Sequence, residues 1–254
     1  MIFTKVGIPK EHGSWSFVLE PLLLSLIVAF SLEGLLLALA TFFLFLSNQP
    51  LKIVANKTSS KKFKSTGIAV FSFYFLTAIV LLIFPLYNLK FEVLLPFFVG
   101  VMLMPIYLFA VLKNYARNLF VELLPIFSMT LIAVSIIMID NSFSFSPIVF
   151  GVLLLSRAIP TVMYIGAKVK EAKKNKFSVL PTHLLNIGFS LFIIYASFVN
   201  LLPQFTILGA ILLTTRSAIG FSRFSFAKTI KQIGVMEFIY GSLFVVINGI
   251  AFLI

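Results

Sequence analysis

The chain has 254 residues, of which 60% are hydrophobic and 11% are charged, and its mean hydropathy is +1.11. A water-soluble fold of this size cannot bury so much apolar surface, which includes 31 Phe side chains. The composition therefore excludes a soluble globular protein and predicts an integral membrane protein. The sequence contains no cysteine, which also excludes disulfides and thiolate metal ligands.

Apolar segments recur along the whole chain and are separated by short polar gaps. Each segment has roughly 17–22 residues, long enough for a helix to cross a hydrocarbon core of about 30 Å. No gap is longer than about 15 residues, so we expect a single polytopic membrane domain over 1–254. The predicted fold is an all-α bundle of about nine transmembrane spans, at residues 14–31, 34–51, 66–86, 92–112, 119–139, 145–166, 179–199, 201–219 and 233–254.

The cations lie on one side of this bundle. Apart from Arg157, inside the sixth segment, and Lys90, all Lys and Arg residues fall in alternate gaps, and the other gaps are nearly free of them. Cytoplasmic loops carry such an excess, so the amino terminus is predicted to be cytoplasmic and the carboxyl terminus external. The net charge of +12 has the same origin and indicates membrane lipids, not nucleic acid, as partners. The cation-bearing gaps hold Lys5 and Lys10; Lys52, Lys57, Lys61, Lys62 and Lys64; Lys113 and Arg117; Lys168, Lys170, Lys173, Lys174 and Lys176; and Arg216, Arg223, Lys228 and Lys231.

Ionisable side chains inside the spans single out candidate functional residues. Each costs about 2.5–3.5 kcal/mol on insertion scales unless it has a partner, a wet cavity or an interfacial position. Arg157 lies roughly 13 Å from the cytoplasmic end of its segment. It is predicted either to pair with Glu20 or another carboxylate, or to bind an anion. Glu122 and Glu237 lie about one turn into their segments, where a carboxylate also complements the helix dipole.

Two of the gaps resemble the signature loops of the UbiA superfamily of intramembrane prenyltransferases. That family has nine helices, a cytoplasmic amino terminus and Asp-rich motifs after its second and sixth helices, written N-D-x-x-D-x-x-x-D and D-x-x-x-D-x-x-x-G-x-x-T-L-P. The matching positions here are Asn48, Gln49, Lys52 and Asn56 in the first loop, and Lys168, Ala172, Lys176, Val179, Leu180 and Pro181 in the second. Every aspartate that would hold magnesium against a diphosphate is replaced. Lysine cannot coordinate magnesium but can neutralise phosphate directly, so the resemblance implies the topology without the metal chemistry.

A closer resemblance, over nearly the whole chain, is to the YwiC-like family of bacterial integral membrane proteins. It is carried by Pro9-Lys10-Glu11-His12-Gly13-Ser14-Trp15, by Ser156-Arg157-Ala158 and by Lys231-Gln232-Ile233-Gly234-Val235-Met236-Glu237. The resemblance implies a multi-pass protein of the bacterial cytoplasmic membrane. It implies no particular reaction.

These observations favour a prenyltransferase-like bundle that binds an isoprenoid or another lipid, with its anionic head group in a cytoplasm-facing cavity. If the protein is an enzyme, it is a diverged transferase acting on a prenyl or lipid substrate. Magnesium-dependent prenyl transfer is not expected, and no resident metal or cofactor is predicted. The residues predicted to meet the head group are His12, Glu20, Asn48, Gln49, Lys52, Arg157, Lys168, Lys170 and Glu237.

Two other functions remain open from the sequence. A small-anion or metabolite transporter would use Arg157 as a mid-membrane site, and Pro21, Pro105, Pro125 and Pro160 as breaks in its helices. A structural or assembly subunit of a larger membrane complex would need only a Phe-rich lipid-facing surface.

Overall fold

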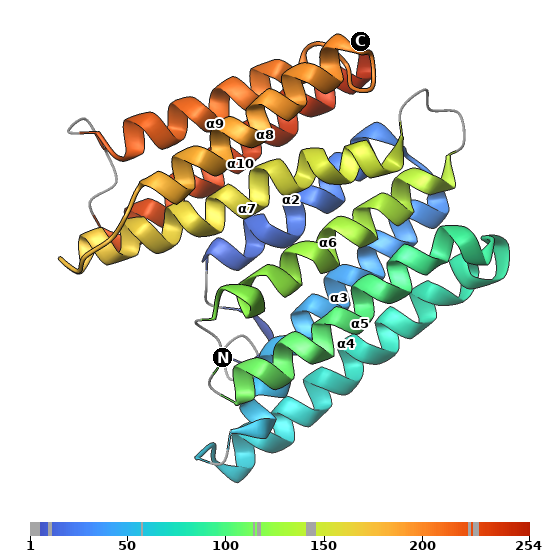
Figure 1. Cartoon of the computed structure of the whole chain (residues 1–254). Coiled ribbons are helices and arrows are strands. Elements are labelled where there is room, and N and C mark those ends of the chain that lie inside the picture. Colours follow the sequence, from blue (N-terminus) through green and yellow to red (C-terminus); the bar gives the residue numbers. More distant parts are fainter. Residues whose placement is uncertain are drawn as a thin grey trace. The chain divides into compact units, whose positions relative to one another are not determined.

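The computed structural model describes residues 6–9, 12–56, 58–113, 115, 118–140, 146–222, 225 and 229–254, with the backbone alone for 12–14. This described part of the chain contains nine helices with defined bounds and no strand (Figure 1). An all-α fold is therefore confirmed. The helices belong to two compact units, one formed by Met1–Ser14 with Ala29–Asp140 and the other by Trp15–Val28 with Asn141–Ile254.

The first unit consists of four helices: α3 (Leu32–Ala55), α4 (Lys61–Asn88), α5 (Phe91–Leu112) and α6 (Leu119–Ile139). Helix α3 packs on α4, and α5 packs on α6. The second pair approaches closely because Gly100 has no side chain, and an added Cβ would lie 2.7 Å from the backbone oxygen of Ser128. The hydroxyl of Ser128 donates to the carbonyl of Gly100 at 2.7 Å, and that of Ser135 donates to the carbonyl of Val93 at 2.6 Å. Two interhelical hydrogen bonds thus join α5 to α6 where water is absent.

The second unit consists of α2 (His12–Val28) from Trp15 onward, α7 (Pro147–Ala172), α8 (Leu180–Phe198), α9 (Thr206–Gly220) and α10 (Ile230–Leu253). Helix α9 packs between α8 and α10, and α7 packs on both α8 and α10. Helix α2 meets α10 where Ile27 contacts Gly249. Helix α10 begins with a capping box, in which Thr229 and Gln232 satisfy each other's backbone N–H groups.

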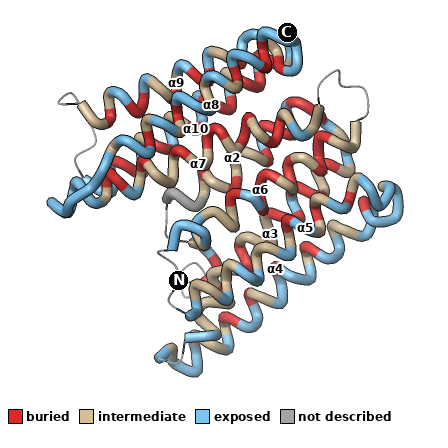
Figure 2. The backbone as a smooth tube through the Cα atoms, viewed as in Figure 1, coloured by how far each residue is buried: buried red, intermediate tan, exposed pale blue. Residues whose placement is uncertain are grey.

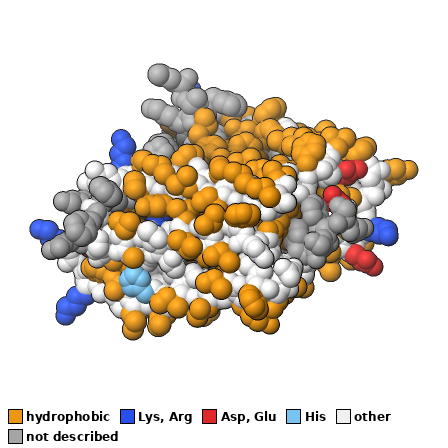
Figure 3. All heavy atoms as spheres, turned by 90° about the horizontal axis from the view of Figure 1, so that it is seen from above, with side chains coloured by type: hydrophobic (Ala, Val, Ile, Leu, Met, Phe, Trp, Pro, Cys, Tyr) orange, Lys and Arg blue, Asp and Glu red, His pale blue; other side chains and the backbone are white. Residues whose placement is uncertain are grey.

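Seven of the described helices are long and apolar enough to cross a membrane: α3, α4, α5, α6, α7, α8 and α10. The apolar part of α2, Trp15–Val28, and all of α9 are shorter than a usual span. Long hydrophobic side chains remain exposed along α4 and α5, whereas α6 is largely buried (Figure 2). Hydrophobic side chains fill the middle of the face in Figure 3, and cations lie at its edges. The chain is thus a multi-pass membrane protein. Seven helices meet the length of a span, instead of the nine predicted segments.

Helices also extend beyond the predicted apolar segments. Helix α3 continues to Ala55 and α7 continues to Ala172, so Lys52, Lys168 and Lys170 are helical and not in loops. Lysine and alanine favour helix, and a lysine stem can lie along apolar surface while its ammonium reaches a polar region. These two helices therefore end several residues later than the apolar segments predict.

Candidate functional site

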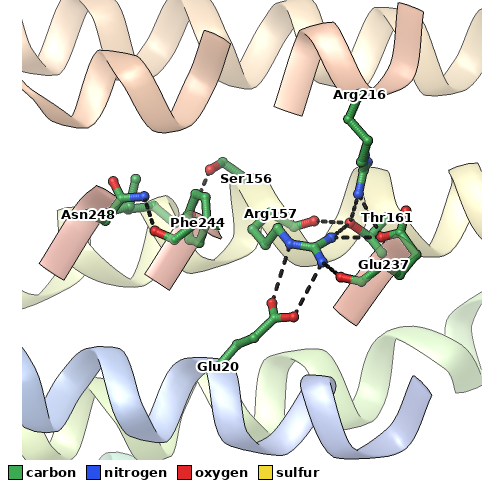
Figure 4. A network of polar contacts seen from close by, with 9 residues as sticks. Glu20, Ser156, Arg157, Thr161, Arg216, Glu237, Phe244 and Asn248 are labelled. Atoms are coloured by element: carbon green, nitrogen blue, oxygen red, sulfur yellow. Dashed lines mark hydrogen bonds and ion pairs between the residues drawn. The ribbon is translucent and has the colours of Figure 1, made fainter. Parts of the chain in front are cut away.

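Four ionisable side chains and one hydroxyl from four helices of the second unit meet in one place, which we call the arginine–carboxylate cluster (Figure 4). Glu20 comes from α2, Arg157 and Thr161 from α7, Arg216 from α9 and Glu237 from α10. Arg157 and Thr161 lie four residues apart on one face of their helix, as the period of an α-helix requires. Two guanidinium groups and two carboxylates thus share a buried position among the helices of the second unit.

Arg157 is at the centre of the cluster and contacts both carboxylates. Its Nη1 donates to Oε2 of Glu237 at 3.2 Å, and its Nη2 donates to Oε1 of Glu20 at 3.3 Å and to the backbone oxygen of Glu237 at 3.2 Å. Its Nε lies 3.3 Å from Oε2 of Glu20, an ion-pair distance without hydrogen-bond geometry. Arg157 therefore has the carboxylate partners that one of its two predicted roles required.

Arg216 enters the cluster from α9 with its side chain fully buried. Its Nη1 donates to Oε2 of Glu237 at 2.8 Å and to the hydroxyl of Thr161 at 2.9 Å. The guanidinium carbon lies 4.7 Å from the centre of the Tyr164 ring, a cation–π contact on one face of the group. Its Nε and Nη2 have no hydrogen-bond partner among the residues that the structure describes. Arg216 is thus held in place on one side and keeps unused donors on the other.

The hydroxyl of Thr161 connects the two arginines. It accepts a hydrogen bond from Nη1 of Arg157 and another from Nη1 of Arg216, and it donates to the backbone oxygen of Arg157. A hydroxyl has one donor and two acceptor positions, so all three are in use. This hydroxyl fixes the two positive groups next to each other.

Space for Glu20 is provided by a glycine on the facing helix. A Cβ placed on Gly241 of α10 would overlap the carboxylate of Glu20 and lie 3.1 Å from Nη2 of Arg157. The carboxylate thus occupies the volume that any other side chain at this position would fill. Gly241 is a requirement for the Glu20–Arg157 ion pair.

A third buried cation, Lys168, lies nearer the end of α7. Its ammonium donates to the backbone oxygen of Gly220 at 2.9 Å, to the hydroxyl of Ser225 at 3.2 Å and to Oε2 of Glu171 at 2.5 Å. Gly220 is the last residue of α9, where unpaired carbonyls and the helix dipole favour a cation. Lys168 therefore caps α9, and the ligand role predicted for it stays a prediction.

The structure brings together only some of the predicted head-group residues. Glu20, Arg157 and Glu237 meet in the cluster, and Lys170 is exposed on α7. Asn48, Gln49 and Lys52 lie on α3 of the other unit, where the Asn48 amide donates to backbone oxygens of its own helix. The side chain of His12 lies outside the described residues.

Sequence reasoning missed Arg216, Thr161, Tyr164 and Gly241. The pattern of cations groups Arg216 with the gap that follows, although the predicted segment 201–219 already contains it, and the structure buries it on α9. Thr161 and Tyr164 follow Arg157 by four and seven residues, so helical periodicity alone places all three on one face. Nothing in the sequence shows that the space above Gly241 holds a carboxylate. Among the described residues, no three His, Asp or Glu side chains gather as metal ligands would.

The comparisons with known proteins give one match. A family model described as YwiC-like protein matches residues 8–137. No curated protein and no solved structure matches the chain. The matched segment contains Glu20 and ends before Arg157, Arg216 and Glu237, so three of the four ionisable residues of the cluster follow it.

Proposed function

The chain belongs to the YwiC-like protein family, and we propose that it binds the anionic head group of a membrane lipid at the arginine–carboxylate cluster. The single observation that carries the proposal is the unused edge of Arg216. Nε and Nη2 lie along one edge of the planar guanidinium, and this edge binds two oxygens of a phosphate or carboxylate in parallel. A buried donor without a partner costs free energy, so such an edge calls for an acceptor.

The depth of Arg216 supports a lipid head group as this acceptor. Arg216 lies four residues before Gly220, the end of α9, which is about 6 Å along the helix axis. Its position close to one end of α9 supports an anion at the membrane surface as its partner. Tyr164 contacts one face of the guanidinium, and the buried Nε/Nη2 edge has no hydrogen-bond partner among the described residues.

We further propose that the lipid tail, an isoprenoid or another hydrocarbon chain, lies between the helices. This proposal is supported by the resemblance of the two loop positions to those of the UbiA superfamily. We propose that the helices of this chain are arranged as in that superfamily, without Asp-held magnesium. Arg157 is already paired with two carboxylates, so Arg216 takes the leading role in binding, and Arg157 positions Glu237.

Arg216→Lys is expected to weaken lipid binding by tenfold or more. The substitution keeps the positive charge but removes the Nε/Nη2 edge, and hydrogen bonds to charged groups contribute about 1.5–3 kcal/mol each. The measurement is native mass spectrometry of the detergent-purified protein, with the wild type carrying a phosphate-bearing lipid that the variant loses. The matched control is Lys62→Ala, which removes an exposed cation from the first turn of α4. A wild type without such an adduct, or an adduct equally abundant in Arg216→Lys, contradicts the proposal.

The orientation of the chain is a second part of the proposal. A reporter fused after Ile254 is expected to read as external, and one inserted at residues 57–60 as cytoplasmic, because the gap there is rich in lysine. This result requires that α9 crosses the membrane despite its shorter apolar length, because the two reporters are separated by the seven helices α4 to α10. A cytoplasmic signal after Ile254 would refute the orientation while leaving the lipid site untouched.

A further inference from the structure

We infer that an anion entering at the free edge of Arg216 is accompanied by a proton that binds the carboxylate of Glu20. The inference rests on the proposed function and names how the same site is regulated: lipid binding would strengthen as pH falls. Neither a redox change nor a covalent change is involved. One proton joins one carboxylate to give a carboxylic acid, and one anion joins the cluster.

The charges of the arginine–carboxylate cluster balance when no ligand is bound. Arg157 and Arg216 carry two positive charges, and Glu20 and Glu237 carry two negative charges, so the cluster is neutral without a ligand. A lipid phosphodiester would leave one uncompensated negative charge among side chains removed from water. Such a charge costs several kcal/mol in a low-dielectric environment, by an order-of-magnitude estimate. Uptake of one proton by a carboxylate restores neutrality.

Glu20 is the carboxylate that the contacts select. Oε2 of Glu237 accepts from both arginines, at 3.2 Å and 2.8 Å, whereas Glu20 contacts Arg157 alone, at 3.3 Å. The Glu20 side chain is 15% exposed and that of Glu237 is 5% exposed. Glu20 therefore loses less when its charge is removed, and a proton reaches it more readily.

The groups around Glu20 come from three helices. Arg157 of α7 is its direct partner, Glu237 of α10 and Arg216 of α9 act on it through space, and Gly241 of α10 adds no charge. Protonation of Glu20 frees part of the Arg157 guanidinium. Arg157 then interacts more strongly with the bound anion, so protonation of Glu20 and binding of the anion favour each other.

Coupling of one proton to one anion has a defined pH dependence. Between the pH at which Glu20 becomes protonated in the free protein and the higher pH at which it loses its proton in the complex, the lipid's Kd should rise by about tenfold per pH unit. Below the lower of these two pH values, Glu20 already carries its proton and the Kd becomes independent of pH. The sign follows from linkage, since binding takes up a proton and is opposed when protons are scarce.

The test is isothermal titration of the detergent-purified full chain with dioleoylphosphatidylglycerol, in two buffers of different ionisation enthalpy. This lipid is a phosphodiester whose single charge does not change near neutral pH, so any proton taken up comes from the protein. We expect about one proton bound per lipid for the wild type. Glu20→Gln, which imitates the protonated carboxylate, should bind with no proton uptake and with a Kd that does not depend on pH.

The control is Glu92→Gln, which replaces an exposed carboxylate in the first turn of α5 and should behave as the wild type does. Lipid binding by the wild type without proton uptake would overturn the coupling and leave the proposed function standing. Proton uptake that persists in Glu20→Gln would also overturn it. No binding of this lipid or of a polyprenyl phosphate by the wild type would overturn both, since the coupling rests on the site.

Discussion

Glu237→Ala should destabilise the protein more than any other single substitution of a carboxylate. The Glu237 carboxylate is buried and accepts hydrogen bonds from two arginines, so its loss leaves two guanidinium groups with Glu20 alone. Removing one partner of a buried ion pair costs about 3–5 kcal/mol, because the remaining charge stays buried and unpaired. The measurement is the thermal unfolding midpoint of the purified protein in detergent, which should fall by several degrees or leave no folded protein to purify.

Two variants make the Glu237 result specific. Glu237→Gln keeps an oxygen that can accept a hydrogen bond and should lie between Glu237→Ala and the wild type. Glu92→Ala removes an exposed carboxylate and should leave the midpoint unchanged. Equal midpoints for Glu237→Ala and Glu92→Ala would show that the cluster contributes nothing to stability.

Gly241→Ala is expected to break the Glu20–Arg157 ion pair from the opposite side. The added Cβ would occupy the position of the Glu20 carboxylate, which must then move away from Arg157. The loss of stability should be comparable to that of Glu20→Ala, because both substitutions leave Arg157 without this partner. Thermal unfolding of the two single variants and of the double variant measures the effect.

The double variant distinguishes this mechanism from a general defect in α10. When Glu20 is already alanine, the nearest atom to the Cβ at position 241 is Nη2 of Arg157 at 3.1 Å, the flexible end of a side chain. Gly241→Ala should then add little, which is the non-additivity expected of residues in contact. Gly234→Ala on the same helix is the matched control, since nothing lies within 4 Å of its Cβ. Additive losses in the double variant would disprove the contact.

Much of the fold follows from the sequence because its cause is local. Each apolar segment contains a helix, and the polar gaps contain residues that begin helices, such as Ser60, Asn118 and Thr229. The lengths of the helices are harder to predict from hydropathy. Helix α7 runs past the predicted end at residue 166 to Ala172, because lysine and alanine continue a helix after the apolar residues stop.

The candidate site was only partly predictable. A buried arginine requires a counter-charge, so a carboxylate near Arg157 could be expected from insertion cost alone. The role of Arg216 depends on where α9 ends and on how that helix is rotated against α7 and α10. Those are properties of packing between helices, and no local pattern of residues encodes them. The match between Gly241 and Glu20 is likewise visible only when two distant segments lie together.

The shortness of α9 has a consequence for the bilayer around it. Its 15 residues cover about 22 Å, less than the roughly 30 Å of a typical hydrocarbon core. A bilayer adapts to a short helix by becoming thinner beside it, which draws neighbouring phosphates inward. A lipid next to α9 would therefore carry its head group to the depth of Arg216 without leaving its leaflet. The length of α9 would thus determine how deep in the bilayer a lipid phosphate must lie to bind Arg216.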